Sequence, residues 1–315
     1  MAPSLRQLKF TDAVFFLILH RCIKEDSISF PALADLHMGH YEEPTEPRPQ
    51  AQLSPPLPSV AAVLKAMPSL ENLFISSMYT NQKAIKMHRV FDQSDDEEGI
   101  DFGCDKLATL TFSHVYESFN SRVLYHALTS LEKLVLDDID PYFDELWSLA
   151  GAAKARPDNQ LESLKIAFSR QEDVMTLLSP ISQQCFPTLL GAFSRLRKYE
   201  LLFLELAVPA AVELSFISLP PSLEIFTVDV ILPSQAVAEK LVDSIITWVA
   251  NRKHTQAPSL KTLRLGISLG TPDEEYGLIE SWDEFDDGCR PVERLRAVCR
   301  THDLNLVMDP YAHSL

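Results

Sequence analysis

The feature that most constrains the fold is a short template, Leu-x-x-Leu-x-Leu, which recurs nine times and is preceded directly by Ser in five windows. The nine windows begin at Leu5, Leu33, Leu70, Leu107, Leu131, Leu161, Leu196, Leu223 and Leu260. A motif that recurs along a whole chain is typical of stacked repeats, in which each unit buries its apolar side against its neighbours. The sequence therefore says more about architecture than about a reaction.

The polarity of the residues inside each window predicts which side of the strand is buried. All three template positions are apolar in every window, whereas only three of the eighteen residues that flank the middle position are apolar: Phe74, Val135 and Ile225. Because neighbouring side chains in a strand point to opposite faces, each window predicts a strand with one buried and one solvent-facing side. Strands covered on both faces are nearly continuous apolar runs. We therefore expect a parallel sheet with helices on one side only.

The segments between the windows complete this prediction. Apolar residues recur at helical spacing in 142–155, 235–249 and 292–300, and the alternation at 304–308 predicts a closing strand. Two insertions interrupt the pattern: 44–58 contains six prolines, and 92–101 is an acidic run. We expect one α/β solenoid over residues 1–315, a horseshoe of about nine to ten irregular repeats with a concave parallel sheet and helices on the convex side.

Composition narrows the class of partner. The chain has 28 Lys and Arg residues against 44 Asp and Glu residues, a formal net charge of −16. This balance argues against a general nucleic-acid binder, because phosphate binding needs clustered basic residues. No segment approaches the roughly 20 apolar residues of a membrane span. The five cysteines are scattered, without a C-x-x-C pair, so we expect reduced thiols in an intracellular protein, cytoplasmic or nuclear.

No chemical motif predicts catalysis. The chain lacks G-x-G-x-x-G, G-x-x-x-x-G-K-[ST] and G-x-S-x-G, and its histidines and carboxylates do not follow metal-ligand spacing. We therefore expect a protein that is not an enzyme, with no catalytic residue, cofactor or metal. The sequence leaves open whether Ser94, which precedes four acidic residues, is phosphorylated.

The polar side of the strands is the candidate partner-binding face. Basic residues outnumber acidic ones there by five to two, although the whole chain is acidic. This difference favours a protein partner that offers an acidic or polar segment. The candidate residues are Lys9, His37, Phe74, Thr111, Lys133, Val135, Lys165, Lys198, Ile225 and Arg264.

The repeated strand resembles that of the leucine-rich repeat superfamily over roughly residues 3–308. The uneven repeats, the Pro-Ser-Leu openings and the ending Cys-Arg-Thr-His-Asp-Leu-x-Leu resemble the repeat regions of fungal F-box proteins. One departure is clear: no window carries Asn or Cys eight residues after its first leucine, where many members of the superfamily do.

The resemblance implies protein binding, with substrate recognition in a ubiquitin ligase as the particular role. No F-box is found in the chain, so a Skp-type adaptor is an expected partner only if an F-box precedes Met1. The alternative is an acidic, horseshoe-type regulator or inhibitor of a partner enzyme.

Overall fold

The computed structural model describes residues 4–10, 19, 21–23, 28–40, 64–77, 105–113, 127–137, 143–168, 187–206, 209–269, 280–281 and 290–308. The chain forms two compact units, which divide between Leu161 and Glu162. We refer to residues 1–161 as unit 1 and to residues 162–315 as unit 2. Each unit combines parallel strands with helices, so the predicted α/β class with a parallel sheet is confirmed.

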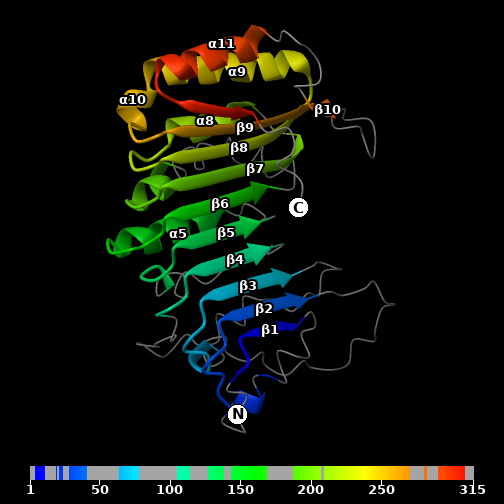
Figure 1. The fold of residues 1–315 in the computed structure, drawn as a ribbon, viewed down its shortest axis with the longest axis vertical. Helices are drawn as coiled ribbons and strands as arrows, with labels where there is room; N and C mark the ends of the chain where they lie inside the picture. The colour runs from blue at the N-terminus through cyan, green and yellow to red at the C-terminus, as the bar shows by residue number, and fades with distance from the viewer. Residues whose placement is uncertain are drawn as a thin grey trace. The chain divides into compact units, whose positions relative to one another are not determined.

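In unit 1 the structure describes five strands that pair in chain order, all parallel (Figure 1). They are β1 (Gln7–Phe10), β2 (Asp35–His40), β3 (Asn72–Ser77), β4 (Thr109–Ser113) and β5 (Lys133–Asp137). Helix α5 (Phe143–Ala155) follows β5. Parallel neighbours need a return connection of a dozen residues or more, which explains why successive windows begin 24 or more residues apart.

In unit 2 the described strands are β6 (Ser163–Phe168), β7 (Lys198–Leu206), β8 (Ile225–Leu232), β9 (Thr262–Leu269), β10 (Glu280–Ser281) and β11 (Asn305–Met308). Strands β6 to β9 are parallel and pair in chain order. The predicted closing strand is β11, which pairs in parallel with the first four residues of β9, while β10 pairs antiparallel with its last two.

The labelled helices of unit 2 are α8 (Pro209–Ile217), α9 (Gln235–Asn251), α10 (Lys253–Gln256) and α11 (Arg290–Thr301), and residues 187–192 before β7 are also helical. Helix α9 packs against both α8 and α11 (Figure 1). The apolar stripe predicted for 235–249 is buried at Leu241, Ile245 and Val249, together with Trp248. The three helices expected from the sequence therefore correspond to α5, α9 and α11.

The strand register places the middle template residues side by side within each unit. In unit 1 these are Leu8, Leu36, Leu73, Leu110 and Leu134, and in unit 2 Leu164, Tyr199, Phe226 and Leu263, with Leu306 of the closing strand beside Leu263. All of them are buried except those on the terminal strands β1 and β11, which are partly exposed. Tyr199 and Phe226 stack nearly parallel, with ring centroids 5.3 Å apart. The windows are therefore strands whose template positions are aligned within each unit and whose buried side is the predicted one.

One backbone arrangement precedes the strands. Before β3, the N–H groups of Glu71 and Asn72 both donate to the carbonyl oxygen of Ala34, at 2.9 Å each. The same pair of bonds to a carbonyl of the preceding window recurs before β2, β4, β5, β7, β8 and β9. Each window thus satisfies the backbone groups at the start of the next strand, as buried polar groups require.

The serine that precedes the first leucine has a structural role in two windows. The hydroxyl of Ser130 donates to the carbonyl oxygen of Leu107 at 3.0 Å, and that of Ser222 donates to the carbonyl oxygen of Leu196 at 2.9 Å. In both cases the acceptor belongs to the first leucine of the preceding window. The Ser-Leu opening is therefore part of the contact between successive windows.

Helix α11 ends in a left-handed turn. Asp303 has a φ of 52°, the N–H of Leu304 donates to the carbonyl of Cys299 at 2.9 Å, and that of Asp303 donates to Arg300 at 3.3 Å. These are the two bonds of a Schellman C-cap, in which a left-handed residue ends the helix. Burial raises the pKa of the Cys299 thiol to about 11, in keeping with the reduced, buried cysteine expected there.

Several expectations lie outside the described residues: the proline-rich insertion 44–58, the acidic insertion 92–101 and Ser94. In the part of the chain that the structure describes, no helix is both long enough and apolar enough to span a bilayer.

Candidate partner-binding face

The side chains opposite the leucine core form rows across the strands of each unit. We call the residues directly before the middle template position the first row, those directly after it the second row, and those two positions further on the third row. The first and second rows contain all ten candidates, in the order Lys9, His37, Phe74, Thr111, Lys133 and Val135 in unit 1 and Lys165, Lys198, Ile225 and Arg264 in unit 2.

The second row of unit 1 is centred on an aromatic pair. The rings of His37 and Phe74 lie with their centroids 4.0 Å apart and tilted by 42°, and both residues are half-buried. Partial burial, followed by the nearby Lys9 charge, lowers the pKa of His37. The imidazole is therefore neutral at pH 7, so this part of the row offers a flat, uncharged aromatic surface.

The neighbours of this pair are polar or buried. Val135 was expected to be an exposed anchor for the partner. It is only 8% exposed, so it offers little surface to a partner. In the first row, the Asn72 Nδ2 group donates to the Asp35 carboxylate at 2.7 Å. Lys133 in the same row is exposed. The described face of unit 1 is therefore mixed in character, with Phe74 and His37 as its apolar centre.

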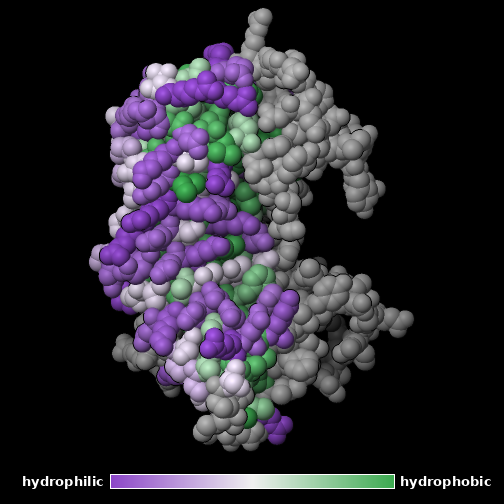
Figure 2. All heavy atoms as spheres, in the orientation of Figure 1, coloured by the Kyte–Doolittle hydropathy of each residue, from purple (hydrophilic) through white to green (hydrophobic). Residues whose placement is uncertain are grey.

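One cation in the rows of unit 2 is paired with an anion of the same face. Lys198 forms an ion pair with Glu200, which lies two residues further along β7. Since both residues enter the count of five basic to two acidic residues, the excess of basic residues is unchanged. Arg264 is exposed, and Thr227 and Ile225 beside it are partly exposed. Figure 2 shows hydrophilic side chains over most of the described surface in this view, with hydrophobic patches between them.

The third row departs from the prediction of an uncovered face. Ala167 and Asp229 are 0% and 1% exposed, Leu202 is 8% exposed, and Gly266 is buried. In unit 1, Ser113 in this row is 6% exposed. The prediction of one fully bare side was therefore wrong for these positions and for Val135 in the second row, whereas Asp137 in the third row is partly exposed. A period of two in the sequence reports which way a side chain points, but not whether something covers it.

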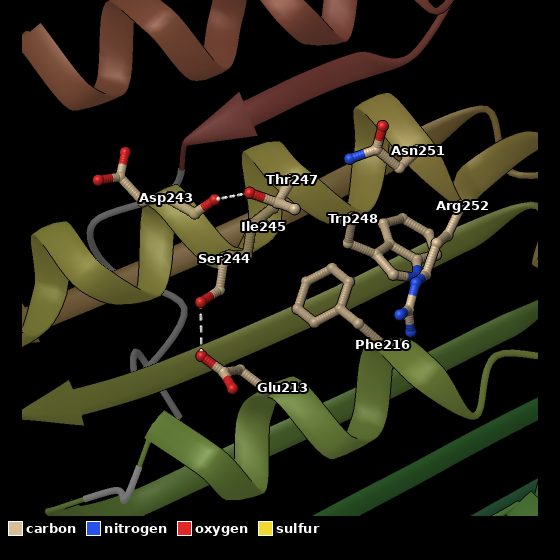
Figure 3. Close-up of a pocket in the computed structure, with 9 residues that line it drawn as sticks. All are labelled: Glu213, Phe216, Asp243, Ser244, Ile245, Thr247, Trp248, Asn251 and Arg252. Carbon is tan, nitrogen blue, oxygen red and sulfur yellow. Dashed lines mark hydrogen bonds between the residues drawn. The ribbon is translucent and has the colours of Figure 1, made fainter.

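A groove on the helical side of unit 2 was not predicted from the sequence. It has a volume of about 480 Å³ and runs between α8 and α9 (Figure 3). Phe216 and Trp248 form its aromatic wall, with ring centroids 5.2 Å apart. Ser244 donates to the Glu213 carboxylate across the groove at 2.6 Å. No sequence signal marks it, because it is formed by two helices whose proximity depends on the packing of separate windows.

Among the residues that the structure describes, no group of three or more His, Cys, Asp or Glu side chains is placed to hold a metal ion together.

Comparison with known proteins does not add a family. No protein-family model matches the chain, and no curated protein matches its sequence. The arguments for function therefore come from the rows and from the resemblance noted in the sequence.

Proposed function

We propose that this protein is a non-enzymatic scaffold that binds a protein partner through the first and second rows of its strands. The observation that carries this proposal is the register of partly exposed, chemically varied side chains across consecutive parallel strands. Neighbouring strands lie about 4.8 Å apart, so each row offers contacts at regular spacing along an extended partner segment. Residues on a sheet lose little conformational freedom on binding, which favours affinity.

The aromatic pair His37–Phe74 is the proposed anchor in unit 1. Aromatic side chains that are partly exposed and surrounded by polar residues resemble the centres of protein interfaces, where a few such residues supply most of the binding energy. The exposed Lys9 and Lys133 lie in the rows around this pair. In unit 2, Arg264 and Lys165 give the second row its positive charges. The preferred partner segment is therefore extended, apolar at one position and acidic at others.

The proposed architecture behind this surface is a leucine-rich-repeat-like solenoid that continues through the whole chain. Its support is the Leu-x-x-Leu-x-Leu template and the bonds that recur at the start of the described strands. Within that family, substrate recognition related to F-box ubiquitin ligase receptors is the favoured role, inside the cell. Co-purification of the Skp adaptor with the full-length gene product tests this role, and its absence from such a preparation would contradict it.

The rows can be tested by charge reversal. The row variant combines Lys133→Glu, Lys165→Glu and Arg264→Glu. The control variant combines Lys106→Glu, Lys154→Glu and Lys240→Glu, which replace three exposed lysines outside the rows. Affinity purification with quantitative mass spectrometry should show at least a roughly tenfold loss of bound partner, about 1.4 kcal/mol, for the row variant alone. Equal recovery with both variants would refute binding through the rows.

The second candidate is an acidic regulator or inhibitor of a partner enzyme. The formal charge of −16 favours it, because an acidic surface speeds association with a basic partner. This alternative predicts binding that weakens steeply with salt and a partner whose activity falls on addition of the protein. It also predicts that the control variant, which adds negative charge outside the rows, binds at least as well as the wild type.

A further inference from the structure

Two histidines far apart in the sequence converge at one end of unit 2. His254 belongs to α10, and His302 follows the last residue of α11. The Nε2 atom of His254 lies 3.1 Å from the Nδ1 atom of His302, and the ring centroids are 5.2 Å apart with the planes tilted by 45°. The sequence gives no hint of this pair, because 48 residues separate its members.

The fold fixes the backbone on both sides of the pair. The N–H of His302 donates to the carbonyls of Val298 and Cys299, both at 3.1 Å, within the Schellman turn that Asp303 completes. Lys253, which is 4% exposed as a residue, donates from its ammonium group to the carbonyl oxygen of His302 at 3.3 Å. Lys253 directly precedes His254, so this bond ties the two histidine-bearing segments together. The convergence of the rings is therefore a product of packing.

The distance between the two nitrogens permits only a single proton between them, with one ring as donor and the other as acceptor. It also suits a shared metal ion. Imidazole nitrogens bind Zn²⁺ at about 2.0–2.1 Å, so two such ligands on one ion stand roughly 3 Å apart. Neutral imidazole is a good ligand for Zn²⁺, Ni²⁺ and Cu²⁺, whereas Mg²⁺ and Ca²⁺ prefer oxygen.

We propose that His254 and His302 form a two-imidazole site for a divalent transition ion such as Zn²⁺ or Ni²⁺, which joins α10 to the end of α11. Water completes the coordination of the ion, so the site is of modest affinity. His254 is exposed and can turn to bind, while His302 is partly exposed. The carboxyl-terminal end of α11 carries a partial negative charge that favours a cation there. The positive charge of the Lys253 ammonium group disfavours a bound cation, but this group is directed at the carbonyl oxygen of His302.

The test uses the full chain with ZnCl₂ and NiCl₂, followed by calorimetric titration and by the thermal unfolding midpoint. Variants His254→Gln and His302→Gln each remove one ligand, and His37→Gln in unit 1 is the matched control. The wild type and the control should bind and show a higher unfolding midpoint with the metal, since a ligand of the native state stabilises it. Each of the other two variants should bind at least about tenfold more weakly, a loss of about 1.4 kcal/mol.

Two further readouts separate metal binding from a structural role. Without metal, His254→Gln should unfold at the wild-type midpoint, because an exposed polar substitution has little effect on stability. The double variant should bind no more weakly than either single variant, since either change already destroys the shared site. Equal metal response in the wild type and all single variants, or no response in the wild type, would overturn the proposal.

Discussion

The first and second halves of β8 and β9 differ in their surroundings, although each half alternates the direction of its side chains in the same way. In the first halves, Ile225 and Thr227 on the open face are partly exposed and Arg264 is exposed. In the second halves, Asp229, Ile231 and Ser268 on the same face are 1%, 8% and 2% exposed. The first half is thus a surface available to a partner, while the second half is core on both faces.

The largest expected effect comes from one pair of isoleucines on one strand and one face. Ile231→Ala should lower the free energy of unfolding by about 2–4 kcal/mol, because it empties a buried site. Ile225→Ala should cost about 1 kcal/mol or less, since that side chain is partly in water already. Denaturant unfolding of both variants provides the measurement. Equal losses at the two positions would break the distinction between the two halves.

The next effect probes the hydrogen bonds at the beginning of the strands. Ser222→Ala removes the bond to the Leu196 carbonyl and should destabilise unit 2 by about 1 kcal/mol. Ser259 occupies the same place before β9 but is exposed, and its hydroxyl makes no hydrogen bond to another residue that the structure describes. Ser259→Ala should therefore change stability by less than about 0.5 kcal/mol. A larger loss for Ser259→Ala than for Ser222→Ala in urea unfolding would contradict this role of the opening serine.

The turn before β11 allows a test in the stabilising direction. Asp303→Gly should raise the free energy of unfolding by about 0.5–1 kcal/mol, because glycine adopts a positive φ without steric cost. Asp303→Val should lower it, since a β-branched residue is strained in that conformation. Thermal unfolding with calorimetry measures both. Stabilisation by valine would show that this strand start does not depend on the left-handed cap.

The smallest effect concerns His37 in the first half of β2. Its pKa is lowered in the folded state below the usual 6.5, so the unfolded chain takes up this proton first as the pH falls. The contribution of His37 to the free energy of unfolding is therefore fully present above about pH 6.5. It is lost as the pH falls from there through the lower pKa of the folded state. Between pH 7 and pH 5 the wild type should therefore lose slightly more stability than His37→Gln. A steeper acid loss in the variant, measured by urea titration at each pH, would show the opposite shift.

Much of the local structure follows from the sequence. The template positions predicted the strands, their common register and the side occupied by the leucines, since a period of two is a property of the backbone itself. Helical spacing likewise predicted α5, α9 and α11. The Lys198–Glu200 ion pair could also have been anticipated, because residues two apart in a strand share a face. Reading those residues only as separate charges missed that one cation of the face is paired with one of its anions.

The sequence by itself determined the nine template strands, the closing strand, the helices α5, α9 and α11, and the direction of the strand side chains, because these follow from periodicity within a segment. Only the tertiary structure decided that Asp229 and Ile231 are covered, that α8 and α9 enclose a groove, and that His254 meets His302. These features join segments that are separated by many residues, so they depend on how the packed core brings the chain together. The periodicity within one segment gives no information about which distant segments will contact it.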